Sequence, residues 1–209
     1  MFVLSLCKQL CPDKLPVVPD QRLGEGADGE VFTIVDDPTK VLKLGILYEY
    51  GKIKLSKAYG NIDRALEYMI QTQPSAYVRV YRHGSMGVYS RDNVAFRKGK
   101  QSFVIYYYIM EKLEKISEDE RRVFHSILSH EDSGIEKNYS STKIKEMLQG
   151  MRRSLDFDEE KVTLFCDNIK SVPVYHLDIH VRNIMKDRDG NFKLIDLDRI
   201  ELEKENDKY

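Results

Sequence analysis

The sequence carries no excess of either charge. Its 33 Lys and Arg residues face 34 Asp and Glu residues, which leaves a formal net charge of −1. A protein that binds nucleic acid or an anionic membrane through its overall field carries a marked basic excess. We therefore expect no nucleic-acid partner and no electrostatic attachment to a membrane.

Long apolar runs are also missing. No window reaches the roughly 18 apolar residues that a spanning helix requires, so the sequence predicts no membrane span. The apolar start over residues 1–7 has no basic stretch and no small-residue cleavage site, and it is therefore not a convincing signal peptide. A specialised export signal would leave no trace in these features.

Cysteine is scarce, with three residues at Cys7, Cys11 and Cys166. An odd number without a second pair or a nearby His does not build a zinc site. We expect ordinary reduced thiols, which indicate folding inside the cell and a cytoplasmic location. Hydrophobic residues at 42% and charged residues at 32% describe a globular chain, and 209 residues suit one domain or two small lobes.

The most informative stretch lies near the end of the chain. Residues 175–183 read Tyr-His-Leu-Asp-Ile-His-Val-Arg-Asn, so Asn183 follows Asp178 by five positions. An apolar strand over residues 192–195 then ends at Asp196. Phosphoryl transfer uses this set of side chains, because one carboxylate orients the attacking hydroxyl while an amide and a second carboxylate hold Mg²⁺.

A short hairpin is predicted between these two motifs, with its tight turn at Asp189-Gly190. Such a hairpin would fold the two metal ligands back toward each other. An alternative is that His176, Asp178 and His180 form a zinc site, or merely a polar loop. Neither alternative explains the glycine-rich stretch and the lysine described next.

Glycines occur at Gly24, Gly26 and Gly29, with Val31 two residues later. Glycine lets backbone amides approach phosphate oxygens without a Cβ in the way. A dinucleotide-binding fold places such a run between a strand and a helix. Here β-branched residues continue over residues 30–35, so we expect a strand, a loop and a second strand.

Lys43 lies inside the next short apolar strand, where a surface lysine on an edge strand is the simpler interpretation. An amphipathic helix is predicted over residues 58–71 from apolar residues at helical spacing. Glu67 on that helix is the preferred ion-pair partner of Lys43, and Glu49 is the other candidate.

Further strands are predicted over residues 78–84 and 102–110, joined by a polar connection over residues 90–100. Later apolar stripes predict core helices over three ranges, with Asp156 or Asp158 as the cap of the last: 118–129, 142–151 and 158–172.

Taken in order, the glycine-rich stretch, Lys43, and the loop with its following Asp resemble the protein-kinase-like superfamily. The resemblance covers residues 22–199. It implies an α+β, bilobal fold with a β-rich N-lobe over residues 20–113 and a truncated, mainly helical C-lobe over residues 114–209. Residues 1–19 would be a leader that packs on the N-lobe.

The resemblance also implies roles. ATP and Mg²⁺ would be the cofactors, and Lys43 would pair with the α- and β-phosphates while the glycines and Val31 cover the nucleotide. Backbone groups of Glu111 and Leu113 would bind adenine, with Met110 at the back of the pocket. Asp178 would be the catalytic base, and His176 would pack and hydrogen-bond the loop. The metal would be held by Asn183 and Asp196, with Asp198 as a further ligand.

Two departures from the protein-kinase motifs bear on which molecule accepts the phosphate. His180 stands where many Ser/Thr protein kinases keep a Lys, which is similar to aminoglycoside and choline phosphotransferases. Asp198 replaces the Gly of Asp-Phe-Gly. The sequence ends at Tyr209, thirteen residues beyond Asp196, which leaves no room for an activation segment and resembles RIO-type, lipopolysaccharide-core and injected bacterial effector kinases.

Three functions stay open at this point. The first is a Ser/Thr protein kinase, with a protein substrate and an activating partner protein as the implied partners. The second is a phosphotransferase for a small hydroxyl compound. The third is a kinase-like pseudoenzyme that serves as a binding module.

Overall fold

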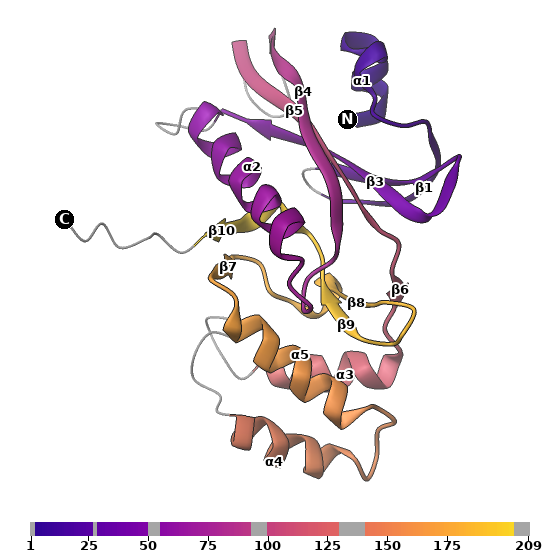
Figure 1. Ribbon diagram of the computed structural model, residues 1–209, viewed down its shortest axis with the longest axis vertical. Helices are drawn as coiled ribbons and strands as arrows, with labels where there is room; N and C mark the ends of the chain where they lie inside the picture. The colour runs from indigo at the N-terminus through magenta and orange to yellow at the C-terminus, as the bar shows by residue number, and fades with distance from the viewer. Residues whose placement is uncertain (1–2, 27–28, 50–54, 93–99, 130–140, 203–209) are drawn as a thin grey trace, which may run out of the picture. The chain divides into compact units, whose positions relative to one another are not determined.

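The computed structural model describes residues 3–26, 29–49, 55–92, 100–129 and 141–202 (Figure 1). The chain divides into two compact units. The first comprises Met1–Gln71 and Arg79–Lys112, and the second comprises Thr72–Val78 and Leu113–Tyr209. The predicted α+β class is confirmed, because the described residues form mostly antiparallel strands together with five α-helices.

The first unit is built on a five-stranded antiparallel sheet with the order β1-β2-β3-β5-β4. The strands have these bounds: β1 Pro19–Glu25, β2 Gly29–Ile34, β3 Asp37–Tyr48, β4 Val80–Asp92 and β5 Lys100–Glu111. β3 is the central strand, and it pairs with β5 from Lys40↔Glu111 to Tyr48↔Phe103. Period-two side-chain alternation along these strands gives the sheet two apolar faces, each covered by one helix.

Helix α1, Val3–Leu10, covers one face of this sheet, and the 3₁₀-helix η1, Pro12–Lys14, follows it. Val3, Leu6 and Cys7 are buried in one cluster with side chains of β2, β3 and β5. Val3, Leu6, Cys7 and Cys11 from the predicted leader belong to the core of that unit, because apolar positions three and four apart form one buried stripe on α1.

Helix α2, Leu55–Thr72, lies along the first unit's sheet and begins three residues before the predicted helix (Figure 1). Its buried stripe includes Ile62, Leu66 and Met69. Tyr59 contacts the ring of Tyr106 on β5 at 6.1 Å between centroids.

The predicted polar connection over residues 90–100 is partly wrong. β4 continues to Asp92 and β5 begins at Lys100, so polar residues still pair in register, as in Ser90↔Ser102. Cross-strand backbone hydrogen bonds form whatever the side-chain polarity, which explains the extra length. The rest of that connection and the predicted loop over residues 131–141 lie outside the described residues, apart from Ser141, which begins a helix.

The second unit combines three helices with short strands. The helices are α3 Glu118–Ser129, α4 Ser141–Met151 and α5 Glu159–Ser171, close to their predicted bounds. Asp158 caps α5 by accepting the N–H of Lys161 at 3.0 Å. The strands are β6 Glu114–Lys115, β7 Val174–His176, β8 Ile184–Lys186, β9 Phe192–Leu194 and β10 Ile200–Leu202, with β6-β8-β9 in one sheet and β10-β7 in another.

No helix among the described residues is long and apolar enough to cross a membrane. The three cysteines are buried free thiols. Burial raises the pKa of Cys7 to about 12, and it does the same for Cys166. Thiols of that kind react slowly because the thiolate is the reactive form.

Candidate active site

His176 joins the loop to the strand that precedes Asp196. Its Nδ1 accepts the backbone N–H of Asp178 at 3.2 Å, and its Nε2 contacts the carbonyl oxygen of Ile195 at 3.0 Å. An acceptor Nδ1 leaves Nε2 as the donor, so these two bonds fix one neutral tautomer. Burial lowers the pKa of His176, which favours that neutral form. The residue packs and hydrogen-bonds the loop, as predicted.

Asn183 binds the same two segments from the other side. Its side-chain Nδ2 donates to the backbone carbonyl of Asp178 at 2.9 Å, and its backbone carbonyl accepts the N–H of Ile195 at 2.8 Å. The side chain is buried. Since the amide nitrogen is engaged, the Oδ1 atom is the group that Asn183 offers to a ligand. Ile195 is therefore held through its N–H by Asn183 and through its C=O by His176.

Asp196 follows directly and has a left-handed backbone, with φ of 64° and ψ of 59°. Asp tolerates this region better than most residues, yet the conformation is uncommon and persists where its surroundings impose it. The two bonds to Ile195 on one side and fully buried Leu197 on the other supply that constraint. Asp198 stands one residue beyond Leu197 in the 3₁₀-helix η3, Leu197–Arg199.

The hairpin between the two motifs forms as predicted. Ile184 pairs with Leu194, and Gly190 takes a positive φ of 76° in the turn. Lys186 on β8 contacts Glu120 of α3 at 2.9 Å, while the rings of Phe192 and Phe124 meet edge-on at 4.8 Å. The hairpin is thereby anchored on α3, and the residues at its two ends keep their positions.

These hydrogen bonds hold the backbones of Asp178, Asn183 and Asp196 close together in the second unit. Two carboxylates and an amide oxygen are hard ligands of the type that Mg²⁺ prefers. In the part of the chain that the structure describes, no three His, Cys, Asp or Glu side chains cluster as a metal site. A His176, Asp178 and His180 zinc site is therefore not formed.

Two side chains flank the catalytic candidate, one half-buried and one exposed. His180 Nε2 lies 3.7 Å from Oδ2 of Asp178, whose side chain is 32% exposed. Leu177, immediately before Asp178, is 63% exposed. Sequence reasoning missed Leu177, although an apolar residue between two polar loop residues was the available signal.

In the first unit, the glycine-rich stretch lies on the β1–β2 hairpin. The N–H of Gly26 donates to the carbonyl of Gly29 at 2.8 Å. This strand-loop-strand context agrees with the prediction and excludes the strand-helix arrangement of a dinucleotide-binding fold. A Cβ added at Gly24 or Gly26 would meet nothing within 4 Å among the described residues, whereas one at Gly29 would meet the carbonyl oxygen of Leu44 at 2.5 Å.

Packing therefore explains the glycine at position 29 and leaves the other two unexplained. Neither Gly24 nor Gly26 has a positive φ.

Lys43 is on the central strand β3 and is only 8% exposed, so the edge-strand interpretation is wrong. It pairs with Val31 on one side and with Tyr108 on the other, and its Nζ lies 5.5 Å from the centre of the Tyr108 ring. A buried lysine at the middle of a sheet is uncommon, because burial of an ammonium group is costly.

Glu67 has a partner that sequence reasoning missed. Its Oε2 contacts Nε2 of His83 on β4 at 3.2 Å, and its Oε1 accepts from Gln71 at 2.8 Å. The His83 contact lowers the pKa of Glu67. Asp63, one helical turn earlier, lies 3.3 Å from Nδ1 of the same His83. This histidine therefore connects α2 to the sheet through its hydrogen bond with Glu67.

The proposed pairing of Lys43 with Glu67 stays a prediction. His83 pairs with Tyr108, which pairs with Lys43, so Lys43 is two strand spacings from His83, or about 10 Å. Glu49 is a poor alternative, because six residues of nearly continuous strand separate it from Lys43 by about 20 Å.

The predicted hinge residues lie at the end of β5 and just beyond it. Met110 is buried and pairs with Val80. The backbone N–H of Glu111 donates to the backbone carbonyl of Arg79 at 3.0 Å. The side-chain Oε1 of Glu111 accepts the backbone N–H of Arg79 at 2.7 Å. Because that N–H is engaged, the adenine prediction rests on the Glu111 carbonyl and the Leu113 backbone. The division between the two units falls between Lys112 and Leu113.

No protein-family model matches this chain, and no curated protein sequence matches it significantly.

Proposed function

We propose that this protein is an Mg·ATP-dependent phosphotransferase of bilobal, protein-kinase-like organisation, acting on a Ser or Thr hydroxyl of a protein. The observation that carries the proposal is that His176 and Asn183 both hydrogen-bond the backbone of Ile195. It supports the proposal because these bonds, with the Asn183 bond to the Asp178 carbonyl, fix the spacing between Asp178 and Asp196.

The residues of the second unit would divide the chemistry between them. Asp178 would orient the acceptor hydroxyl and take its proton as the new oxygen–phosphorus bond forms and the bond to the β-phosphate oxygen breaks. Oδ1 of Asn183 and the carboxylate of Asp196 would hold Mg²⁺, with Asp198 as a further ligand. The bound nucleotide and metal supply the phosphoryl group and neutralise its charge.

The residues of the first unit would bind the nucleotide. Lys43 would contact the α- and β-phosphates, and its pairing with Val31 of the glycine-rich hairpin supports that role. The missing side chains at Gly24 and Gly26 would let a phosphate oxygen approach the loop backbone, through amides other than that of Gly26, which donates to Gly29.

The test is phosphate transfer from γ-labelled ATP with Mg²⁺ to a generic acceptor protein and to the enzyme itself. We expect Asp178→Asn to reduce transfer by about 10²–10⁴-fold, as the loss of a positioned base does. Asp189→Asn is the matched control, since it makes the same chemical change at an exposed turn of the same unit. Equal transfer by both variants would refute the assignment, and nucleotide-independent partner binding without transfer would favour a pseudoenzyme.

A second candidate, transfer to a small hydroxyl compound, is favoured by one observation. His180 lies 3.7 Å from Asp178, in the position where aminoglycoside- and choline-type enzymes keep a histidine. ATP turnover only with added small alcohols would select this candidate. His180→Lys should then change the acceptor profile more than the affinity for ATP.

A further inference from the structure

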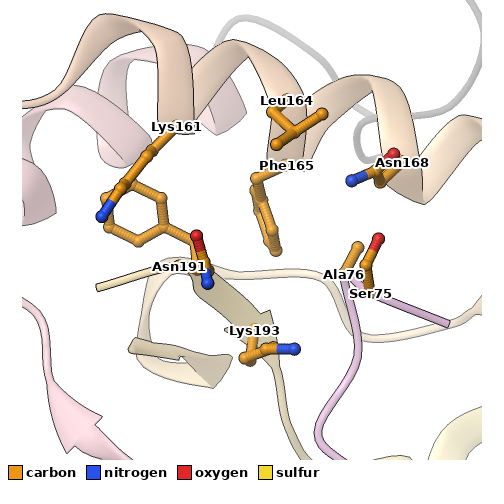
Figure 2. Close-up of a pocket in the computed structure, with 9 residues that line it drawn as sticks. Ser75, Ala76, Lys161, Leu164, Phe165, Asn168, Asn191 and Lys193 are labelled. Atoms are coloured by element: carbon orange, nitrogen blue, oxygen red, sulfur yellow. The ribbon is translucent and has the colours of Figure 1, made fainter. Parts of the chain in front are cut away.

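A pocket lies in the second unit among α5, β9 and the segment Thr72–Val78 (Figure 2). Its volume is about 230 Å³. Figure 2 shows Lys161, Leu164 and Asn168 extending from α5, with Lys193 on the opposite wall and Ser75 beside it. None of the residues assigned to the catalytic site above lines this pocket.

The floor of the pocket is apolar. Phe165 and Phe192 are each 2% exposed and belong to the core of the second unit, so the floor is rigid. Leu164 on α5 lines the same space and is 55% exposed. An apolar group that entered the pocket would cover Leu164 and gain the free energy of removing this surface from water.

The rim of the pocket is positively charged. Lys161 and Lys193 both line it, and none of the lining residues is acidic. Nζ of Lys193 lies 3.6 Å from Asp187, which offsets its charge. Nζ of Lys161 instead donates to the carbonyl oxygen of Asp189 at 2.5 Å. A carbonyl carries no net charge and uses one of three ammonium donors, so Lys161 can still bind an anion.

Amide groups complete the wall. Asn168 and Asn191 present both donors and acceptors, which is the combination that a peptide bond offers in return. Nδ2 of Asn191 donates to Asp187 at 3.1 Å, and this bond fixes the orientation of the amide. Metabolite and cofactor sites occupy roughly 300–1,000 Å³, so 230 Å³ suits one anchoring side chain of a larger molecule better than a whole cofactor.

We propose that this pocket is a docking site for a peptide segment of a partner protein, in which an apolar side chain such as Leu or Phe stands next to Asp or Glu. The apolar side chain would fill the space over Phe165 and Leu164. The neighbouring carboxylate would bind Lys161, and the peptide backbone would bind the asparagine amides. Anchors of this kind, buried in a small pocket, carry most of the affinity in peptide and protein interfaces.

The probe is a fluorescein-labelled heptapeptide, Gly-Ser-Glu-Φ-Glu-Ser-Gly, with Leu or Phe at Φ, titrated with the full chain by fluorescence polarisation. We expect saturable binding, and a peptide with Ala at Φ should bind at least about tenfold more weakly. Replacement of both Glu residues by Lys should abolish binding. Higher salt should weaken it, since the carboxylate–ammonium pair lies at the surface.

The protein variants are Lys161→Glu and Leu164→Asp, with Lys170→Glu as the matched control on the same helix. Glutamate at position 161 is compatible with the first turn of α5, where acidic residues are favoured, so this variant should fold. We expect each of the first two changes to weaken binding by at least about tenfold and the control to stay within about twofold. Circular dichroism would verify folding.

The proposal fails if no peptide of the series binds more tightly than about 1 mM. It also fails if Lys161→Glu and Lys170→Glu weaken binding equally, because that result indicates non-specific electrostatic attraction of the peptide rather than binding in the pocket. Amide chemical-shift changes in the unmodified protein should centre on Ser75, Asn168 and Asn191, and changes centred elsewhere would overturn the site. No nucleotide is present in these assays, so their outcome is independent of whether the protein is a kinase.

Discussion

Replacement of His176 by Phe tests the frame that holds the candidate site together. The ring keeps its approximate volume but loses its bonds to the Asp178 N–H and the Ile195 carbonyl. Each bond contributes about 0.5–1.5 kcal/mol, and a buried group left without its partner costs about 1–3 kcal/mol. We expect the free energy of unfolding to fall by about 2–4 kcal/mol at pH 7.5.

The same histidine gives the prediction a dependence on pH. Burial lowers the pKa of His176 below its ordinary value of 6.5, so below that pH the unfolded chain binds a proton that the folded protein rejects. Its stabilising effect is complete above pH 6.5 and is lost as the pH falls below it, by at most about 1.4 kcal/mol per pH unit. The difference between wild type and His176→Phe should therefore shrink from pH 7.5 to pH 5.5.

Urea unfolding monitored by circular dichroism at both pH values measures these differences. His125→Phe is the control, because His125 is exposed on α3 and its replacement should change stability by no more than about 0.5 kcal/mol. The reasoning is refuted if His176→Phe is as stable as wild type at pH 7.5. A difference that is the same at both pH values would refute the assignment of the neutral buried form.

Three further substitutions address other parts of the structure. Gly29→Ala should lower stability by about 1–3 kcal/mol, because its Cβ would strike a carbonyl of β3, while Gly24→Ala should leave thermal unfolding unchanged and weaken ATP binding in a nucleotide titration. Glu30→Gln should destabilise the first unit by about 1–3 kcal/mol, since both buried carboxylate oxygens accept, from the Leu4 N–H and from Arg22, and the new NH2 group would face one of these donors; an unchanged unfolding midpoint would contradict this. Asn183→Leu should abolish phosphate transfer and cost about 1–3 kcal/mol of stability, and retained transfer in the labelled-ATP assay would count against the metal assignment.

Much of the second unit could be predicted because its signals are local. The core helix over residues 118–129 follows from apolar residues three and four positions apart. The cap at Asp158 and the turn at Asp189-Gly190 depend on side chains within a few residues of the backbone groups they satisfy. The spacing of Asp178 and Asn183 is local for the same reason, since one hydrogen bond spans five residues.

Contacts between distant segments escaped sequence reasoning. Nothing near Glu67 indicates that His83 is its partner, because the contact depends on how α2 lies on the sheet and on the order of the strands. The pocket beside Leu164 combines a helix, a hairpin strand and a segment from far earlier in the chain. Side chains that meet only after folding leave no periodic signal in the sequence.

The sequence by itself determined α2 to α5, the hairpin between the two loop motifs and the set of residues that suits phosphoryl transfer, since each depends on neighbours within a turn or a strand. Tertiary structure alone decided that Lys43 is buried at the centre of a sheet, that α1 belongs to the core, and that His176 and Asn183 grip Ile195 from both sides. The physical reason is that burial and long-range hydrogen bonds depend on which surfaces meet, and many arrangements of the same elements satisfy the same local pattern.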